Sequence, residues 1–175
     1  MKKYLLIVTA LTLICLLATI AWAARVKIVV EAEKCATITP SMQKVTSAVA
    51  SNGAFIQIPL RRPHATSETG PADSGNATYS VNIPSAGSYR FWGRTHWHDG
   101  CGNSFFLKIA GKPAVVLGQD GTYQRWHWVK GPTVQLPAGA LSVVIQNRED
   151  GAKIDQFMLI NDLNYVPVRA ETATQ

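Results

Sequence analysis

No stretch of this chain after residue 25 shows the period of an amphipathic helix, and this limits the possible folds more than any other feature. Short runs rich in valine, isoleucine, tyrosine and phenylalanine alternate with turns that contain glycine and proline. Such a series indicates an all-β fold, a two-sheet antiparallel β-sandwich or a barrel. A helical turn is expected only over residues 42–49. We expect strands over residues 26–32, 54–60, 77–83, 88–95, 104–110, 126–129, 133–136, 141–147 and 153–160.

The first 23 residues have the character of a secretory signal peptide. Two lysines precede an apolar run over residues 4–22, which ends in the Ala-Trp-Ala pattern of residues 21–23. A retained membrane anchor is the alternative, because the run approaches the roughly 20 residues that span a bilayer. We expect cleavage, a secreted or periplasmic protein, and no membrane contact afterwards.

The rest of the chain is expected to form one β-sandwich domain over residues 26–165, followed by a polar tail over 166–175 that frays. Residues 61–76 and 96–103 resemble long loops, where binding groups usually lie. The formal net charge of +6 comes from scattered basic residues. Because nucleic-acid binding requires a concentrated basic patch, we expect no nucleic-acid partner.

Two cysteines, Cys35 and Cys101, follow the signal peptide. An even number of cysteines in an exported protein suggests a disulfide bond. The sequence does not establish that these two residues lie close together, so the bond is a possibility that the pattern leaves open.

The motifs of common enzymes are absent. The chain has no Gly-x-Ser-x-Gly elbow, no His-Glu-x-x-His helix and no phosphate-binding glycine loop. Glycoside hydrolysis requires two facing carboxylates. Glu68, Asp99 and Glu149 are candidates, but none has a recognisable setting. We therefore expect a protein that is not an enzyme.

The segment from His96 to Cys101 raises the question of a transition-metal site. His96 and His98 would share a strand face, and Asp99 or Cys101 could complete a site with His127. The spacing matches no known zinc site, and Cys101 is also a candidate for a disulfide. We therefore disfavour this hypothesis.

Three carboxylates suggest a calcium site. Glu31 and Glu33 lie two residues apart, so an extended strand would direct both to one face. Asp155 lies within an apolar strand, where an uncompensated charge is costly. A calcium ion shared by the three would remove both difficulties. A solvated strand edge is the alternative, and the pattern alone does not decide between them.

The aromatic residues indicate where a ligand could bind. Trp126 and Trp128 would share a strand face, and we expect Trp128 to pack in the core. Trp97 and Tyr123 lie near polar loops and are expected to be exposed. An exposed ring can stack on a sugar while nearby polar groups bind its hydroxyls, which fits the usual construction of a ligand site.

An ordered set of motifs resembles the carbohydrate-binding modules of families 6 and 35, which are galactose-binding-like jelly rolls. The resemblance extends over roughly residues 28–162, and its motifs are fairly specific only as a set. The motifs are VEAE at 30–33, ASNGAFI at 50–56, ATYSV at 77–81, IPSAGSYRFWGR at 83–94, NSF at 103–105, LPAG at 136–139 and KIDQFML at 153–159.

The resemblance implies a lectin-like protein that binds a polysaccharide or another glycan without covalent chemistry. It places a structural calcium ion at Glu31, Glu33 and Asp155. It also implies a sugar site at the loop end of the sandwich, where an aromatic residue of 123–126 stacks on the ligand and the residue that opens the last strand binds it. The expected ligand-binding residues are Trp97, Asp99, Asn103, Tyr123, Trp126 and Lys153.

Two departures from the family pattern bear on function. Family modules often have asparagine where this chain has Ala152 or Lys153, and they are usually attached to an enzyme. Lys153 alone does not establish a preference for acidic sugars. The alternatives are an adhesive surface protein that binds a protein partner through the same sandwich and, less favoured, a glycan-active enzyme.

Overall fold

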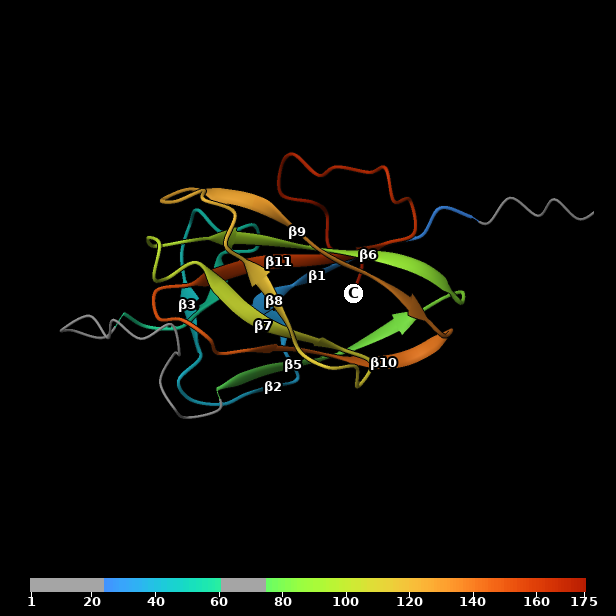
Figure 1. The fold of residues 1–175 in the computed structure, drawn as a ribbon, viewed down its shortest axis with the longest axis horizontal. Helices are drawn as coiled ribbons and strands as arrows, with labels where there is room; N and C mark the ends of the chain where they lie inside the picture. Colours follow the sequence, from blue (N-terminus) through green and yellow to red (C-terminus); the bar gives the residue numbers. More distant parts are fainter. Residues whose placement is uncertain (1–23, 61–74) are drawn as a thin grey trace, which may run out of the picture.

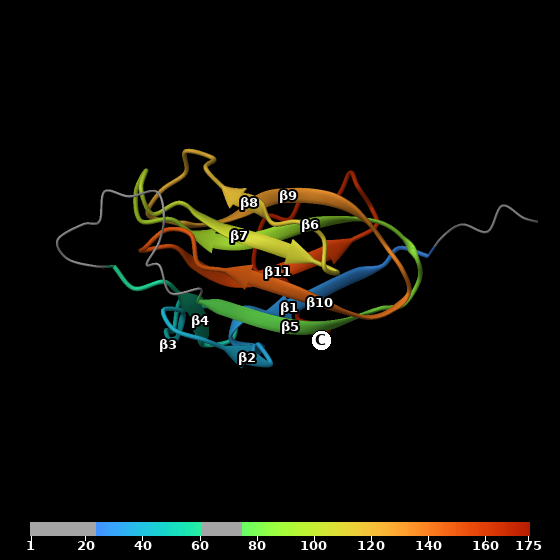
Figure 2. The ribbon, with the colours of Figure 1, turned by 60° about the horizontal axis from the view of Figure 1, so that its bottom comes forward.

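Two antiparallel β-sheets lie face to face in the computed structural model, which describes residues 24–60 and 75–175 (Figure 1). The first sheet has the strand order β3-β4-β11-β6-β9, with β1 also paired to β11, and the second has the order β2-β5-β10-β7-β8. The longer strands of both sheets run along the length of the sandwich (Figure 2). The expected all-β, two-sheet antiparallel sandwich is confirmed. The predicted signal peptide and most of the 61–76 loop lie outside the described residues.

The elements of the first sheet are β1 (Lys27–Glu31), β3 (Gln43–Thr46), β4 (Ala54–Gln57), β6 (Gly87–His96), β9 (Trp126–Leu136) and β11 (Lys153–Ile160). Those of the second sheet are β2 (Thr37–Ile38), β5 (Asn76–Ile83), β7 (Ser104–Ile109), β8 (Val115–Gly118) and β10 (Gly139–Gln146). One 3₁₀ turn, η1 (Ala32–Lys34), follows β1. Within the described ranges, no helix is long and apolar enough to cross a membrane.

The core lies between the sheets, where alternate residues of each strand point inward. Phe157 on β11 stacks on Phe91 of β6 with ring centres 5.5 Å apart. The edge of Tyr79, on the opposite sheet, meets Phe157 at 4.8 Å. All three rings are at most 3% exposed. Burying a side chain of this size contributes about 1.5–3 kcal/mol, so rings of this kind hold the two sheets together.

Strand β9 is continuous where the sequence suggests two strands separated by Gly131-Pro132. Pro132 lacks a backbone N–H, but β9 is an edge strand, and its pairing with β6 shifts register between Arg90 and Trp92. A bulge at an edge strand is where a sheet tolerates proline. A Cβ on Gly131 would lie 2.9 Å from the Phe91 ring, so the close approach of the strands also requires glycine there.

The helical turn expected over residues 42–49 is wrong. Residues 43–46 form β3, which pairs with β4 through four consecutive residues. The hydrogen bonds to β4 outweigh the weak helical pattern of a short segment, as tertiary context often does. The two shortest strands, β2 and the four-residue β8, were also not expected from the sequence.

The last fifteen residues, 161–175, pack against the sandwich and are called here the C-terminal segment. They lie over the outer side of the sheet that contains β6, β9 and β11 (Figure 1). Tyr165 packs against a small apolar cluster that includes Trp92 and Met158. The hydroxyl of Thr174 accepts a hydrogen bond from Val29 N at 2.9 Å. The expectation that the tail frays is therefore wrong, because its polar groups find partners on the sheet.

Candidate functional site

Three side chains form a row across the end of the first sheet. His96 is the last residue of β6, Trp126 the first of β9 and Lys153 the first of β11. In the antiparallel pairing, His96 lies directly opposite Trp126 on one side and Lys153 on the other. Directly opposed residues of antiparallel strands point to the same face. The sheet register therefore assembles an aromatic, an imidazole and a cation from distant parts of the chain.

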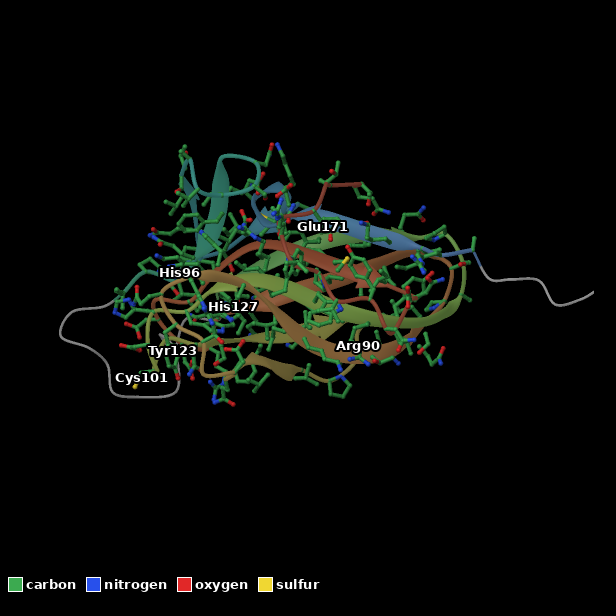
Figure 3. All side chains as sticks on the ribbon, turned by 90° about the horizontal axis from the view of Figure 1, so that it is seen from above. Arg90, His96, Cys101, Tyr123, His127 and Glu171 are labelled. Carbon is green, nitrogen blue, oxygen red and sulfur yellow. The ribbon has the colours of Figure 1, made fainter. Side chains whose placement is uncertain are left out.

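This row lines a pocket of about 320 Å³. His96 lies toward the same end of the sandwich as His127 and Tyr123, whereas Arg90 lies toward the opposite end (Figure 3). The pocket walls come from the β3–β4 turn, from β4, and from the segment that enters β9. The lining residues are Ser47, Val49, Phe55, His96, Gln124, Arg125, Trp126 and Lys153.

The indole ring of Trp126 is held by three neighbours. Phe55 and His96 each meet it in a T-shaped arrangement, with ring centres 5.5 Å apart in both cases. The guanidinium of Arg94 lies over the ring, with its Cζ 5.2 Å from the ring centre. These contacts fix the orientation of a partly exposed aromatic platform, and such a platform with a few polar groups beside it suits a small ligand.

The setting of His96 favours its neutral form. Burial lowers the pKa of its imidazole, and the nearby charge of Lys153 lowers it further. Its Nδ1 is buried and has no hydrogen-bond partner among the described residues. The ammonium of Lys153 lies over the Phe55 ring, 5.8 Å from its centre. The pocket lining thus places an imidazole next to a cation.

The loop after β6 supports the segment that enters β9. The backbone N–H of Gln124 donates to the carbonyl of Trp97 at 2.9 Å, and its side-chain amide donates to the carbonyl of His98. Tyr123 is 41% exposed next to these contacts, but its side chain does not line the pocket. Its role in binding therefore stays a prediction.

Trp97 is not an exposed stacking residue, contrary to the expectation. Its side chain is 0% exposed and packs against Phe105 with ring centres 5.7 Å apart. The physical reason is the alternation of β6, because Tyr89, Phe91 and Trp97 share the parity that faces the core. Trp97 stabilises the base of the loop and cannot stack on a ligand in this arrangement.

Asn103 and Asp99 serve the structure of the same loop. Asn103 is buried, and its amide donates to the carbonyl of Gly100 at 3.0 Å. The carboxylate of Asp99 accepts a hydrogen bond from Cys101 N at 2.9 Å. Neither residue lines the pocket. Of the six expected ligand-binding residues, the pocket therefore brings together Trp126 and Lys153.

Sequence reasoning missed Phe55, Gln124 and Arg125, and it assigned His96 to a metal hypothesis. The signal that could have found His96 is the pairing of strand ends. His96 ends β6, and in the antiparallel sheet it lies opposite the first residues of the two neighbouring strands, β9 and β11. Phe55 reaches the pocket because β4 pairs with β11 beside Lys153.

The metal hypothesis for the histidines has no geometric support. His127 Nε2 lies 2.8 Å from the Asp120 carboxylate, and its Nδ1 lies 3.0 Å from the Arg125 carbonyl. These contacts tie the loop before β9 to the strand itself. Among the residues that the structure describes, no three His, Cys, Asp or Glu side chains are placed to hold a metal ion.

The three acids of the calcium hypothesis are all buried. Glu31 accepts hydrogen bonds from Ser51 Oγ at 2.5 Å and from Gln156 Nε2 at 2.9 Å. Glu33 accepts one from Asn52 Nδ2 at 2.7 Å. Asp155 accepts a hydrogen bond from Ser51 N at 3.0 Å and is ion-paired with Arg94. The solvated strand edge is therefore wrong.

The charges of this cluster are unbalanced. One guanidinium, Arg94, faces three buried carboxylates, and it binds Asp155. Burial raises the pKa of Glu31, as do the negative charges of Glu33 and Asp155, against the hydrogen bonds that Glu31 accepts. One oxygen of Glu33, Oε2, is buried without a hydrogen-bond partner among the described residues. The described residues do not bring these three carboxylates together as a metal-binding group, and a cation fits the spare charge of Glu31 and Glu33 better than it fits Asp155.

The structure leaves both cysteines as free thiols. Cys35 is buried in the core, whereas Cys101 is exposed in the loop after β6 (Figure 3). A disulfide requires the two sulfur atoms to be bonded, and the structure has both as thiols, one in the core and one on the surface. The proposed Cys35–Cys101 bond is therefore wrong.

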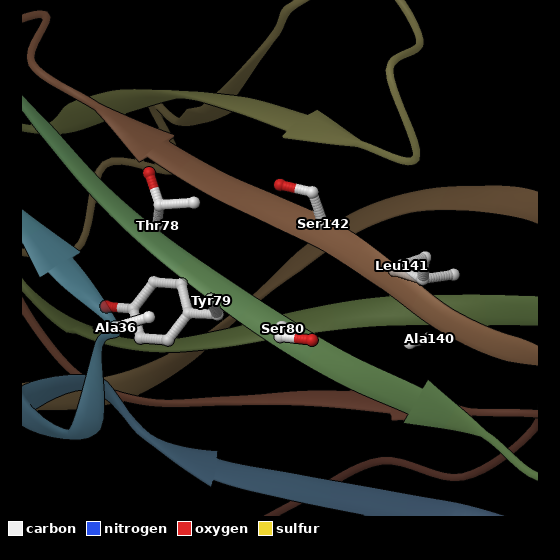
Figure 4. Close-up of a pocket in the computed structure, with 7 residues that line it drawn as sticks. All are labelled: Ala36, Thr78, Tyr79, Ser80, Ala140, Leu141 and Ser142. Atoms are coloured by element: carbon white, nitrogen blue, oxygen red, sulfur yellow. The ribbon is translucent and has the colours of Figure 1, made fainter.

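Two further pockets have less of the character of a ligand site. One, of about 290 Å³, lies on the second sheet between β5 and β10 (Figure 4). Small side chains such as Thr78, Ser80 and Ser142 line it, and the ring of Tyr79 beside it is 3% exposed. The other, of about 240 Å³, is almost wholly apolar and lies beside Val115 and Pro132. Neither offers an exposed ring next to convergent polar groups.

Solved structures with a similar architecture include modules attached to enzymes and isolated modules. The chain matches the GH26-CBM35 β-(1,4)-mannanase of Podospora anserina at 17% identity and a TM-score of 0.59, over 76% of this chain and 27% of that one. It matches a family 35 carbohydrate binding module from Clostridium thermocellum at 17% identity and a TM-score of 0.57, over 77% of this chain and 97% of the module. It therefore has the fold of these modules.

A third similar structure is the module CBM6cm-2 of Cellvibrio mixtus lichenase 5A, in complex with cellotriose. It is 23% identical with a TM-score of 0.55, over 78% of this chain and 97% of the module. The chain spans about a quarter of the mannanase but nearly the whole of each isolated carbohydrate-binding module. No protein-family model and no curated protein sequence matches it.

Proposed function

We propose that this protein is a non-catalytic carbohydrate-binding module whose ligand occupies the pocket formed by His96, Trp126 and Lys153. The observation that carries the proposal is this row of side chains, which lines a pocket of about 320 Å³ at one end of the sandwich. The fold is that of carbohydrate-binding modules of families 6 and 35, and one similar module was solved with cellotriose. Trp126 stacks on a sugar ring, and the neighbouring polar groups bind its hydroxyls.

The composition of the pocket favours binding over hydrolysis. Glycosidases use two carboxyl groups on either side of the scissile bond. The eight residues that line this pocket include no aspartate and no glutamate. The expected outcome is that no reducing ends are released from any polysaccharide that the protein binds. Release of reducing ends by purified protein, lost in Trp126→Ala, would instead identify a glycan-active enzyme.

A structural calcium ion is part of the proposal. Glu31 and Glu33 would hold it beside Asp155, which Arg94 already pairs, and the ion would balance carboxylates that are otherwise buried with too little positive charge. The buried oxygen of Glu33 that lacks a partner supports this assignment. The ion would have a structural role, since Arg94 stands between the acidic cluster and the Trp126 ring.

Export is proposed from residues 1–23 alone. A signal peptidase would cleave after Ala23, so N-terminal sequencing of the protein recovered from the periplasm or the medium should begin at Ala24. Recovery of the uncleaved chain in the membrane fraction would favour the retained anchor.

The binding proposal is tested with the protein that spans residues 24–175, first on a glycan array and then by calorimetry with the best ligand. Trp126→Ala should weaken binding at least about tenfold, which corresponds to roughly 1.4 kcal/mol. Tyr123→Ala tests the exposed ring beside the pocket and should have the smaller effect. Melting curves of both variants control for folding. Absence of binding to every glycan would favour the adhesive protein with a protein partner.

A further inference from the structure

The outer face of the first sheet continues beyond the candidate pocket in a second row of side chains. Trp128 lies two residues after Trp126 on β9, so both point to the same face, about 7 Å apart along the strand. The register places Arg94 opposite Trp128, and Gln156 opposite Arg94. The guanidinium of Arg94 also lies over the Trp126 ring, so the two rows are in contact. A second aromatic ring and a side-chain amide therefore stand beside the pocket.

The C-terminal segment covers this second row through residues 166–175, called here the cover. The indole N–H of Trp128 donates to the carbonyl of Arg169 at 2.8 Å. The side-chain amide of Gln156 donates to the carbonyl of Glu171 at 2.7 Å and accepts a hydrogen bond from its N–H at 2.9 Å. All residues of the cover are described, and none of them lines the pocket. Glu171 lies further than His96 from the loops at this end of the sandwich (Figure 3).

The contacts of the cover are mostly polar. Val166 and Val168 are 65% and 86% exposed, so these two apolar side chains point to water rather than to the sheet. The ion pair of Glu171 with Lys27 is partly exposed, and such pairs contribute little to stability. Parts of a protein that bury little apolar surface open locally at a lower free energy than the core does. The cover can therefore leave the sheet while the sandwich stays folded.

The groups that hold the cover are also suited to hold a sugar. Gln156 binds both the N–H and the carbonyl of one residue, and two adjacent hydroxyls of a sugar offer the same pair of a donor and an acceptor. The indole of Trp128 combines an apolar face with an N–H donor. The second row thus has the composition of a ligand site, an aromatic surface with a few polar groups beside it.

We propose that the cover occupies a second sugar subsite, formed by Trp128 and Gln156, and so sets the length of glycan that the protein binds. With the cover in place, the ligand is confined to the pocket at Trp126. With the cover released, a chain that stacks on Trp126 continues onto Trp128. This inference rests on the proposed function, because the second subsite extends the same site.

A purely structural role for the segment is the alternative, since its Tyr165 packs against the apolar cluster of Trp92 and Met158. The two roles differ in their effect on ligands of different length. Loosening a structural cover would lower stability and would affect the binding of short and long glycans alike. Loosening a cover that occupies a subsite would strengthen the binding of long glycans alone.

The experiment loosens the cover in the protein that spans residues 24–175. Glu171→Pro removes the N–H that Gln156 binds, whereas the matched control Glu171→Gln keeps this N–H and removes only the charge. Both are titrated by calorimetry with cello-, xylo-, manno- and laminari-oligosaccharides, from disaccharide to hexasaccharide. In Glu171→Pro, the hexasaccharide of the series that binds should gain at least about tenfold in affinity, and its disaccharide should not change. Glu171→Gln should bind both as the starting protein does.

Two further measurements show whether the gain comes from the second row. A shift of the tryptophan fluorescence of Glu171→Pro to longer wavelength reports that the cover has left Trp128. Adding Trp128→Leu to Glu171→Pro should abolish the gain for the hexasaccharide and leave the disaccharide bound as before. An equal gain without the Trp128 ring would overturn the inference.

The chain that ends at Tyr165 lacks the cover altogether and is measured at a temperature where its melting curve shows that it is folded. If neither this chain nor Glu171→Pro binds the hexasaccharide more tightly than the starting protein does, the second subsite is wrong. Carbohydrate binding then stands if the disaccharide binds in a manner that depends on Trp126. If no oligosaccharide binds to any of these proteins, both proposals fail.

Discussion

The guanidinium of Arg94 connects Trp126 to Asp155. Its Cζ lies 5.2 Å from the centre of the indole ring, and Nη1 is paired with the Asp155 carboxylate. Asp155 is 0% exposed and receives a further hydrogen bond from Ser51 N at 3.0 Å. One side chain therefore supports the aromatic platform of the pocket and balances a charge in the interior, so the acidic cluster and the pocket are expected to respond together.

Replacing Arg94 with glutamine should destabilise the protein and weaken the ligand site. The variant leaves the Asp155 carboxylate buried without its cation, and breaking a buried ion pair in this way costs about 3–5 kcal/mol. The free energy of unfolding in urea measures the loss. Calorimetry at a temperature where the variant is folded measures the effect on binding, which should fall because Trp126 loses the group that lies over it.

The control for Arg94→Gln is the double variant Arg94→Gln/Asp155→Asn. Removing the negative charge as well should restore part of the stability but none of the support for Trp126. A single variant as stable as the starting protein would show that the Arg94–Asp155 pair contributes nothing.

Calcium should change how stability depends on pH. Burial raises the pKa of Glu31 in the folded state, and nearby Glu33 and Asp155 raise it as well, so the folded protein holds the Glu31 proton more tightly than the unfolded chain does. The stability from this proton is fully present below the unfolded pKa of about 4.3 and is lost as pH rises through the folded pKa. In a chelator, the contribution of Glu31 to stability should therefore fall, and the melting temperature with it, as pH rises through the folded pKa of Glu31.

A bound calcium ion should remove this loss, because it favours the ionised carboxylate. The measurement is a series of melting curves at several pH values, with calcium and with chelator, for the starting protein and for Glu31→Gln. The difference between the two proteins isolates Glu31 from other titrating groups. Identical melting curves with calcium and with chelator in the starting protein at every pH would contradict the calcium proposal.

The local pattern of the sequence was sufficient to predict a strand where polar and apolar residues alternate or where the strand is apolar throughout. The strand expected over 153–160 coincides with β11, and that over 77–83 differs from β5 by one residue. The four-residue β8 follows Pro113 and is too short for a clear alternation, so it depends on its pairing with β7. Trp97 was placed in a loop by its polar neighbours, although the parity of β6 directs it inward.

The candidate site was only partly predictable from the sequence, because the register of the paired strands brings its residues together. Trp126 and Lys153 could be named from the sequence because a resemblance placed ligand groups at the starts of their strands. That His96 lies between them depends on two antiparallel pairings between segments roughly thirty residues apart or more. No local pattern of residues specifies such pairings, whereas the buried acids were identifiable because a charge in an apolar strand needs a partner.

The titration of His96 should report the charge of Lys153. Burial lowers the pKa of His96, as do the positive charges of Lys153, His127 and His98, whereas a backbone hydrogen bond raises it. Lys153→Gln should therefore shift the NMR titration of the His96 ring to higher pH, and Lys108→Gln should not. The associated stability has the opposite sign to that of Glu31: it is present above the unfolded pKa of about 6.5 and is lost as pH falls through the folded pKa.

An unchanged His96 titration in Lys153→Gln would contradict the proximity of the two groups.

Removing residues 166–175 should destabilise the sandwich and expose tryptophan. Gln156 is 0% exposed, and its side chain exchanges two hydrogen bonds with the backbone of Glu171, at 2.9 Å and 2.7 Å. The indole N–H of Trp128 donates to the carbonyl of Arg169 at 2.8 Å. Leaving buried polar groups such as Gln156 without partners costs about 1–3 kcal/mol each, so the melting temperature should fall by several degrees.

The same truncation should shift the tryptophan fluorescence to longer wavelength, because water reaches the ring of Trp128 and the neighbouring Trp92. The matched control is Glu171→Gln, which keeps the backbone contacts with Gln156 and removes the charge that pairs with Lys27 at 2.7 Å. This ion pair is partly exposed, and such pairs contribute about 0–1 kcal/mol, so Glu171→Gln should melt close to the starting protein. Equal melting temperatures and spectra for the truncated and starting proteins would mean that the C-terminal segment is not docked on the sheet in solution.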